Sequence, residues 1–229
     1  MRALMVQEGF GDLRAGVERR VGGCNLRMYR DGGFNVYERE CGGDIRRVRV
    51  AGDKLEVVPA PPVMAEPRVS NIIMLRLPEP LVVSPGSEAS IETSIPVDIV
   101  VVMGSLVVDA IPTYRVKYAL YGNVDKGVIT RFVKLGECRA PCASMRIVVR
   151  NSGGKPVRIE RIVFPAYMLS LCYNGSLVYA NSIFVNAVDD VGSVQPGRLE
   201  AQECRLAPQL LRAPIFERQR QKFLMLYGF

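Results

Sequence analysis

Histidine is absent from the sequence, and with it the side chain that most often acts as a general base near neutral pH. The absence excludes Ser–His and Cys–His nucleophile pairs. No Walker loop or G-x-G-x-x-G motif follows a strand-like segment, and no β-α-β alternation could position one. We therefore expect a protein without catalytic residues and without a cofactor.

Long apolar runs are absent as well. The longest, residues 97–111, is interrupted by two aspartates, a glycine and a serine, and it falls short of the roughly 20 residues that a membrane-spanning helix needs. The apolar residues that follow Met1 are too few for the core of a secretory signal. The sequence predicts a cytoplasmic protein with no membrane span.

Metal-ligand spacing is the third absence. Six cysteines are present, but without histidine and without any C-x2-C pair they do not suggest a zinc site, so no metal is expected. The remaining explanation is intracellular disulfides, as found in hyperthermophiles. Arginine outnumbers lysine 24 to 6, which agrees with such a source but is also produced by a GC-rich genome.

One cysteine pair follows from hairpin geometry. Two strand-like segments flank a Gly-Gly pair at residues 32–33, a favoured two-residue hairpin loop. With that loop, Arg27 lies opposite Glu38 and Cys24 opposite Cys41, at a non-hydrogen-bonded position where side chains come closest. We predict a cross-strand disulfide; the alternative is two buried free thiols.

The other four cysteines give weaker signals. Cys138 and Cys142 are spaced to close a small disulfide loop, and their spacing is not that of a redox C-x-x-C motif. Cys172 and Cys204 then either form a third bridge or remain buried thiols.

What the chain does contain is apolar–polar alternation with period two. Turn residues divide it at intervals of about ten residues, which is typical of a β-sandwich or barrel. Strand-like runs occupy residues 44–50, 54–58, 72–77, 89–95, 97–103, 115–121 and 128–134. Two further hairpins are expected, from residues 145–150 and 157–164 around a turn at 151–154, and from residues 168–173 and 177–185 around Asn174-Gly175.

Helical patterning is confined to residues 208–223, where Pro214 interrupts it, so a loop followed by a strand at 223–227 is preferred. The proline-rich stretch at residues 59–62 cannot lie inside a central strand and suggests a boundary. We predict an all-β protein with an antiparallel β-sandwich over residues 63–229 and an additional smaller β unit of hairpins over residues 1–62. The alternative is an extra sheet on a single body.

Charge is the most informative feature. The net charge is +7, and residues 113–165 alone carry +8, whereas residues 59–112 carry −4. In the expected strand at 115–121, alternation directs Arg115 and Lys117 to an exposed face and Tyr118 and Leu120 to the core. Basic residues interleaved with aromatics can hold a phosphate backbone and stack bases. The predicted binding residues for an anionic partner are Arg115, Lys117, Tyr121, Lys126, Arg131, Lys134 and Arg139.

Four segments resemble a family of uncharacterised archaeal proteins, filed as domain of unknown function 432. They are Arg-Glu-Cys-Gly-Gly at 39–43, Glu-Pro-Leu-Val-Val-Ser-Pro-Gly at 79–86, Lys-Tyr-Ala-Leu-Tyr-Gly at 117–122 and Gly-Val-Ile-Thr-Arg at 127–131. The resemblance spans most of the chain, and the block at 117–122 is its most specific part. It implies no activity, ligand or catalytic residue, because none has been established for the family.

Three functional hypotheses follow. The leading one is a non-enzymatic binding or interaction protein, as a homo-oligomer or as a subunit of a larger assembly. The second is a binder of RNA, DNA or another phosphate-bearing polyanion through residues 113–165; against it stands a solvated basic face that the acidic residues of 59–112 neutralise. The third is a hydrolase that uses carboxylates alone, although Asp189-Asp190 is better explained as a solvated loop.

Overall fold

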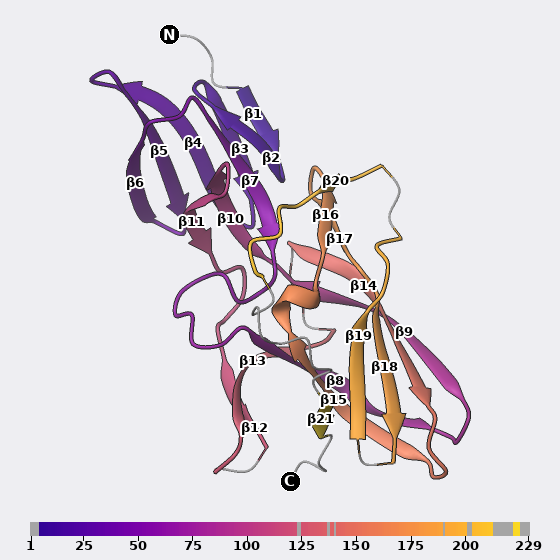
Figure 1. Ribbon diagram of the computed structural model, residues 1–229. Coiled ribbons are helices and arrows are strands. Elements are labelled where there is room, and N and C mark those ends of the chain that lie inside the picture. Colours follow the sequence, from indigo (N-terminus) through magenta and orange to yellow (C-terminus); the bar gives the residue numbers. More distant parts are fainter. Residues whose placement is uncertain are drawn as a thin grey trace.

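The computed structural model describes residues 5–122, 125–136, 138–139, 141–189, 191–200, 203–212 and 222–224. Residues 222–224 are described by their backbone only. In this part of the chain nearly all regular structure is β-strand, and its one helix is the short 3-10 turn η1 (Ala166–Met168). The strands form four sheets with mostly antiparallel pairing (Figure 1). The predicted all-β class and sandwich architecture are thus confirmed.

The first sheet is an N-terminal meander with tight turns. Its order is β1 (Met5–Glu8), β3 (Val17–Val21), β4 (Cys24–Asp31), β5 (Phe34–Cys41) and β6 (Asp44–Val50). Gly-Gly pairs at 22–23, 32–33 and 42–43 make its three hairpin turns, each with both glycines at positive φ, as the favoured two-residue loops require. The loop at 32–33 produces the predicted register, with Arg27 opposite Glu38.

All six cysteines form disulfides. The bridges join Cys24 to Cys41, Cys138 to Cys142 and Cys172 to Cys204. The Cα atoms of the first bridge are 4.3 Å apart, close to the spacing of a non-hydrogen-bonded pair. The first two predicted bridges are therefore confirmed, and the pair that the sequence left open is a third.

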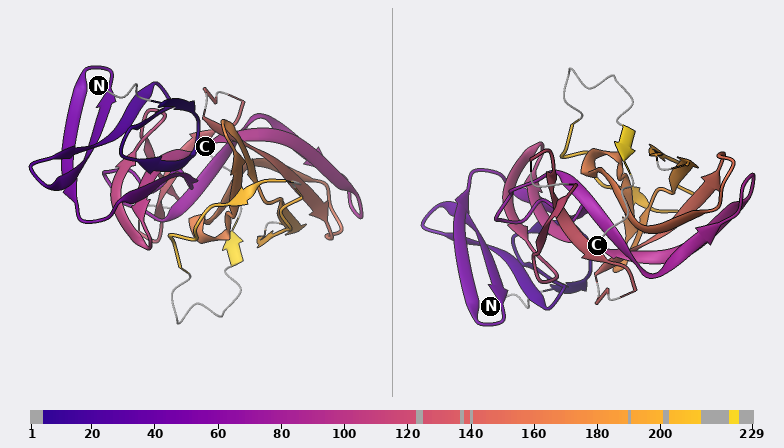
Figure 2. Two further views of the ribbon diagram at one scale, coloured as in Figure 1. Left: turned by 90° about the horizontal axis from the view of Figure 1, so that it is seen from above. Right: turned by 90° about the horizontal axis from the view of Figure 1, so that it is seen from below.

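The second sheet crosses the boundary that the prolines suggested. Its order is β11 (Leu106–Ile111), β10 (Asp98–Met103), β7 (Lys54–Ala60) and β2 (Gly11–Arg14). Because β10 pairs with β7, the hairpin at 98–111 joins the N-terminal strands. The body at the N-terminal end therefore combines residues from both sides of position 62 (Figure 2). Whether residues 1–62 form an independent domain stays a prediction.

Two sheets build the rest of the molecule. The third contains β12 (Tyr118–Tyr121), β13 (Val128–Lys134), β8 (Ile72–Val83) and β15 (Val157–Pro165). The fourth runs from β20 (Arg205–Leu206) through β16 (Leu171–Asn174), β17 (Leu177–Ala180), β14 (Cys142–Asn151), β18 (Ile183–Val188) and β19 (Val191–Pro196) to β21 (Lys222–Leu224), with β9 (Glu88–Pro96) paired to β14.

The prediction of a hairpin around residues 151–154 is wrong. Strand β14 pairs with β9, and strand β15 pairs with β8 in the other sheet. Asn151 lies fully buried where the chain crosses between the sheets, and its side-chain amide donates to the carbonyls of Val83 at 2.9 Å and Lys155 at 2.8 Å. These bonds direct the chain into the third sheet instead of back along β14.

The β16–β17 hairpin is confirmed with a shifted loop. Asn174 pairs with Leu177, so the loop residues are Gly175 and Ser176, with Gly175 at φ 58°. Near the C-terminus, residues 208–212 have no regular structure and β21 pairs with β19. The expected helix or loop at 213–221 and the strand residues 225–227 lie outside the described residues.

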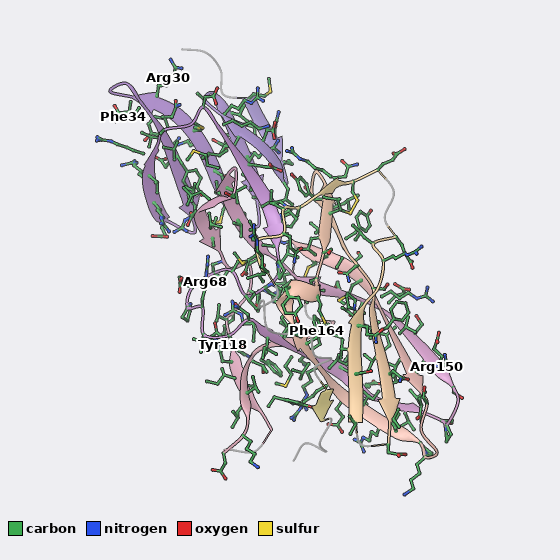
Figure 3. The ribbon with its side chains drawn as sticks, in the orientation of Figure 1. Arg30, Phe34, Arg68, Tyr118, Arg150 and Phe164 are labelled. Carbon is green, nitrogen blue, oxygen red and sulfur yellow. A yellow bond between two sulfur atoms is a disulfide. The ribbon has the colours of Figure 1, made fainter. Side chains whose placement is uncertain are left out.

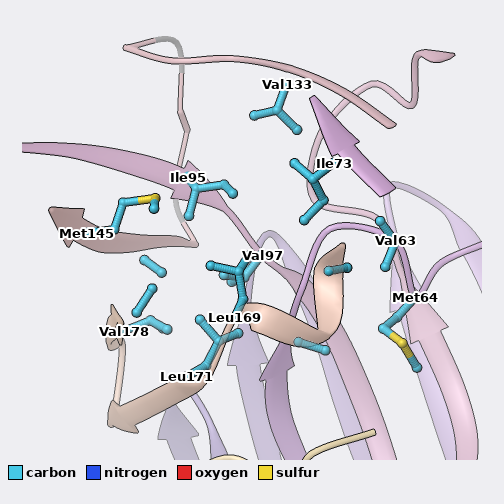
Figure 4. Packing of buried hydrophobic residues seen from close by; sticks show 14 of the residues in the cluster. Val63, Met64, Ile73, Ile95, Val97, Val133, Met145, Leu169, Leu171 and Val178 are labelled. Atoms are coloured by element: carbon cyan, nitrogen blue, oxygen red, sulfur yellow. The ribbon is translucent and has the colours of Figure 1, made fainter. Parts of the chain in front are cut away.

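The hydrophobic core is continuous across the sheets. Figure 4 shows it at their junction, where Val63, Ile73, Val97 and Leu169 come from different elements. All four of these side chains are at most 2% exposed. Within the described residues, no helix has the length and apolar character needed to cross a membrane.

Candidate anion-binding cleft

The candidate site begins with the pairing of β12 and β13. Tyr118 lies opposite Arg131, and one pair earlier the Phe132 N–H donates to the Lys117 carbonyl at 3.0 Å. Lys117 and Phe132 therefore project on the same side of the ribbon. Alternation along β13 places Lys134 on that side too. The strand itself begins at Tyr118, three residues later than expected.

A cleft of about 410 Å³ opens over this side of the ribbon. Its size falls in the range typical of small-molecule sites. The lining residues are Pro96, Thr113, Tyr114, Arg115, Lys117, Phe132, Val133, Lys134 and Arg139. They include four of the seven predicted binding residues, and none of these described lining residues carries a carboxylate. The sequence did not indicate Pro96, Thr113 or Val133, because nothing local signals that they meet here.

Three of the lining cations form no ion pair with an acidic side chain of the described residues. Arg115, Lys117 and Arg139 are exposed or partly exposed, and none forms an ion pair with another described residue. The acidic segment at 59–112 does not cover them. Asp109 pairs instead with Arg39 and Arg46 of the N-terminal meander, at 3.2 and 2.8 Å. Arg115, Lys117 and Arg139 thus keep a positive charge that no described acidic side chain neutralises.

Arg131 is not on the surface, in contrast to the prediction. Its side chain is fully buried; Nε donates to the Tyr114 hydroxyl at 2.7 Å and Nη1 to the Tyr118 hydroxyl at 3.0 Å. The guanidinium carbon lies 5.3 and 5.1 Å from the centres of these two rings, within cation–π range. Arg131 therefore supports the cleft from inside and is not available to a ligand on the surface.

The two tyrosines pass this support on to the loop after β7. The Tyr114 hydroxyl donates to the Pro62 carbonyl at 2.7 Å, and the Tyr118 hydroxyl donates to the carbonyl of Pro67. Burial raises the pKa of Tyr114 far above its ordinary value, so the hydroxyl stays protonated and able to donate. The ring of Tyr114 is thereby held in one position at the cleft wall.

Asp98 completes the buried network. It is fully buried, and its Oδ2 accepts the backbone N–H groups of Met64 and Ala65, both at 2.8 Å. Burial raises its pKa to about 6, and the positive charge of Arg131 partly opposes the rise. Among the described residues, Asp98 Oδ1 and Arg131 Nη2 have no hydrogen-bond partner. Asp98 and Arg131 therefore interact through their charges without direct contact.

The remaining predicted residues lie outside the cleft lining. Tyr121 is half-buried at the end of β12, where burial raises its pKa, and Lys126 is exposed in the following turn. Leu120, expected in the core, is 44% exposed because β12 is an edge strand at its own end of the sheet. Alternation distinguished the two faces of the strand, but it did not predict how far along the strand the hydrophobic core covers the inner face.

The carboxylate-only hypothesis concerned Asp189 and Asp190. Asp189 is exposed at positive φ, and Asp190 lies outside the described residues. In the part of the chain that is described, no group of three or more Cys, Asp or Glu side chains could hold a metal ion.

Comparison with known proteins identifies the family of the chain. Residues 9–226 match the family model described as "Protein of unknown function (DUF432)". No curated protein and no solved structure matches the chain.

Proposed function

The chain belongs to the DUF432 family, whose function is unknown, and we propose from its own residues that it is a non-enzymatic binding protein. The proposed ligand is anionic and carries phosphate. The observation that carries the proposal is the cleft between residues 113–117 and β13, whose described lining includes Arg115, Lys117, Lys134 and Arg139 and no carboxylate.

The physical argument concerns like charges held close together. Arg115, Lys117 and Arg139 lie around one concave surface, where their like charges repel each other and concentrate a positive field in the cleft. An anion relieves the repulsion and gains charge-assisted hydrogen bonds, which are the stronger kind. A solvated face would place such charges apart or beside acidic partners, as Glu92 does for Arg146 on β14, at 3.4 Å.

Inorganic tripolyphosphate is the probe for this proposal. Isothermal titration calorimetry of the full chain should detect binding that weakens steeply as the salt concentration rises, because salt screens exposed charges. We expect Lys117→Ala and Arg115→Ala each to weaken binding about tenfold, the loss of one charge-assisted hydrogen bond.

Matched controls are available at the two ends of the molecule. Arg30 on β4 and Arg150 on β14 are exposed and lie far from Tyr118 and the cleft (Figure 3). Arg30→Ala and Arg150→Ala remove the same net charge and should leave the affinity within about twofold. Equal losses in the control and cleft variants, or no binding at low salt, would overturn the proposal.

The source and compartment are part of the same proposal. An archaeal, hyperthermophilic host and a cytoplasmic location agree with the arginine-rich composition and the cysteine usage. Mass spectrometry of material purified from the native host would identify both the bound ligand and any protein partner.

A further inference from the structure

The cleft contains aromatic rings as well as cations. Phe132 is partly exposed and lies opposite Lys117 on the same side of the ribbon. The ring of Tyr114 also lines the cleft, and its hydroxyl is fixed by Arg131 and the Pro62 carbonyl. A flat apolar surface and a row of cations are thus presented side by side.

Building on the proposed function, we propose that the ligand is a nucleoside phosphate unit, with its base against Phe132 and its phosphates at Arg115 and Lys117. Bases stack favourably on aromatic side chains, and cations beside the ring hold the phosphates that follow the base. A simple inorganic anion would use the cations and leave the aromatic surface without a function.

The chemistry of the lining also predicts how the unit is recognised. Among the described residues, no Asn, Gln, Asp or Glu side chain lines the cleft, so the amides and carboxylates that read adenine or cytosine edges and ribose hydroxyls are absent from this lining. The lysine and arginine side chains, which can also read guanine, are assigned to the phosphates in this arrangement. The hydroxyl of Thr113 already donates to the Val97 carbonyl at 2.7 Å. Recognition therefore rests on stacking and charge, and the four bases are expected to bind with similar affinity.

Phe132→Leu separates stacking from charge. Leucine keeps an apolar side chain beside Lys117 but removes the ring. We expect the affinity for ATP or a short oligonucleotide to fall about fivefold or more, from the usual contribution of one stacked base, and the affinity for tripolyphosphate to stay unchanged. Unchanged tripolyphosphate binding also reports that the variant is folded.

A matched control lies at the other end of the molecule. Phe34 is 53% exposed, with the Arg49 guanidinium 5.5 Å from its ring centre, and is another surface phenylalanine beside a cation (Figure 3). Phe34→Leu should change neither affinity. Oligonucleotides of one to ten bases distinguish the source, since an affinity that grows with length indicates single-stranded nucleic acid and a constant affinity indicates a free nucleotide.

Two results would overturn the inference. If tripolyphosphate binds as tightly as ATP and Phe132→Leu affects neither, the cleft takes anions without a base, and the proposed function stands alone. If one base is preferred more than about tenfold, recognition does not rest on stacking. Absence of binding by every probe would instead refute the proposed function itself.

Discussion

At the scale of single residues, burial decides what the charged groups near the cleft do. Arg131 and Asp98 are both fully buried, and each is held by specific hydrogen bonds. The side chains of the exposed residues Arg115 and Lys117 have no such partners among the residues that the structure describes. Arginine therefore has a structural role where it is buried, at Arg131, and a candidate ligand-binding role where it is exposed, at Arg115.

Asp98 is expected to make stability depend on pH. Its folded pKa is about 6 and the ordinary value is 3.8, so folding favours the neutral form and the ionised form costs free energy above pH 6. Lowering the pH from about 6 to about 4 should raise the free energy of unfolding by roughly 2 kcal/mol through this group. Asp98→Asn should remove that rise.

Urea denaturation at several pH values measures the effect. Asp53→Asn is the control, because Asp53 is exposed in the turn before β7. A rise of equal size in wild type and in Asp98→Asn would contradict the assignment.

Arg131→Ala is expected to act on folding and not on affinity alone. It leaves the hydroxyls of Tyr114 and Tyr118 without their donor and Asp98 without its nearby positive charge. Removing a buried charged partner usually costs about 3–5 kcal/mol. Thermal unfolding should show this loss, whereas Arg139→Ala at the exposed rim should stay within about 0.5 kcal/mol of wild type.

At the scale of elements, Asn151 controls where β14 ends. Besides its two donated bonds, its side-chain oxygen accepts the Gly153 N–H at 2.9 Å, so one buried amide satisfies three backbone groups. Turn residues in the sequence suggested a hairpin at this point. The side chain instead bonds to Val83 of β8, which is 68 residues away in the chain.

Asn151→Ala should destabilise the fold by about 2–4 kcal/mol, because the carbonyls of Val83 and Lys155 lose their donor and one N–H loses its acceptor. Chemical denaturation measures the change. Asn186 on β18 is exposed and accepts one bond from Ser152, at 2.7 Å, so Asn186→Ala should cost less than about 1 kcal/mol. Equal costs for the two variants would refute the role of Asn151.

At the scale of the whole molecule, the C-terminal sheet is joined to the N-terminal body by a polar contact. Arg205 on β20 pairs with Asp12 at 2.9 Å and with Glu56 at 3.1 Å, and the Tyr173 hydroxyl donates to Glu56 at 2.6 Å. The ring of Tyr173 also packs against Phe10, with ring centres 5.8 Å apart. The Cys172–Cys204 bridge fastens β20 beside these residues.

The three disulfides should contribute unequally to stability. Their cysteines are 4, 17 and 32 residues apart, and a longer closed loop removes more entropy from the unfolded chain. Paired Cys→Ser variants should lower the free energy of unfolding by about 2, 3 and 4 kcal/mol in that order. Denaturation under non-reducing conditions tests the order, and a reversed order would show that native contacts outweigh loop closure.

What the sequence determined by itself is local. Period-two alternation indicated strands, and the Gly-Gly pair at 32–33 set a register that brought Cys24 to Cys41, because each signal acts within one hairpin. Alternation also placed Arg115 and Lys117 on one face, which is the face of the cleft.

Only the tertiary structure decided which faces are covered and which distant segments meet. It buried Arg131, exposed Leu120, moved β15 away from β14 and brought Arg139 to the cleft. The physical reason is that alternation states which residues share a face, whereas burial depends on what packs against that face from elsewhere in the chain. The basic, aromatic cleft is therefore a product of the fold, assembled from residues whose charge alone was visible in the sequence.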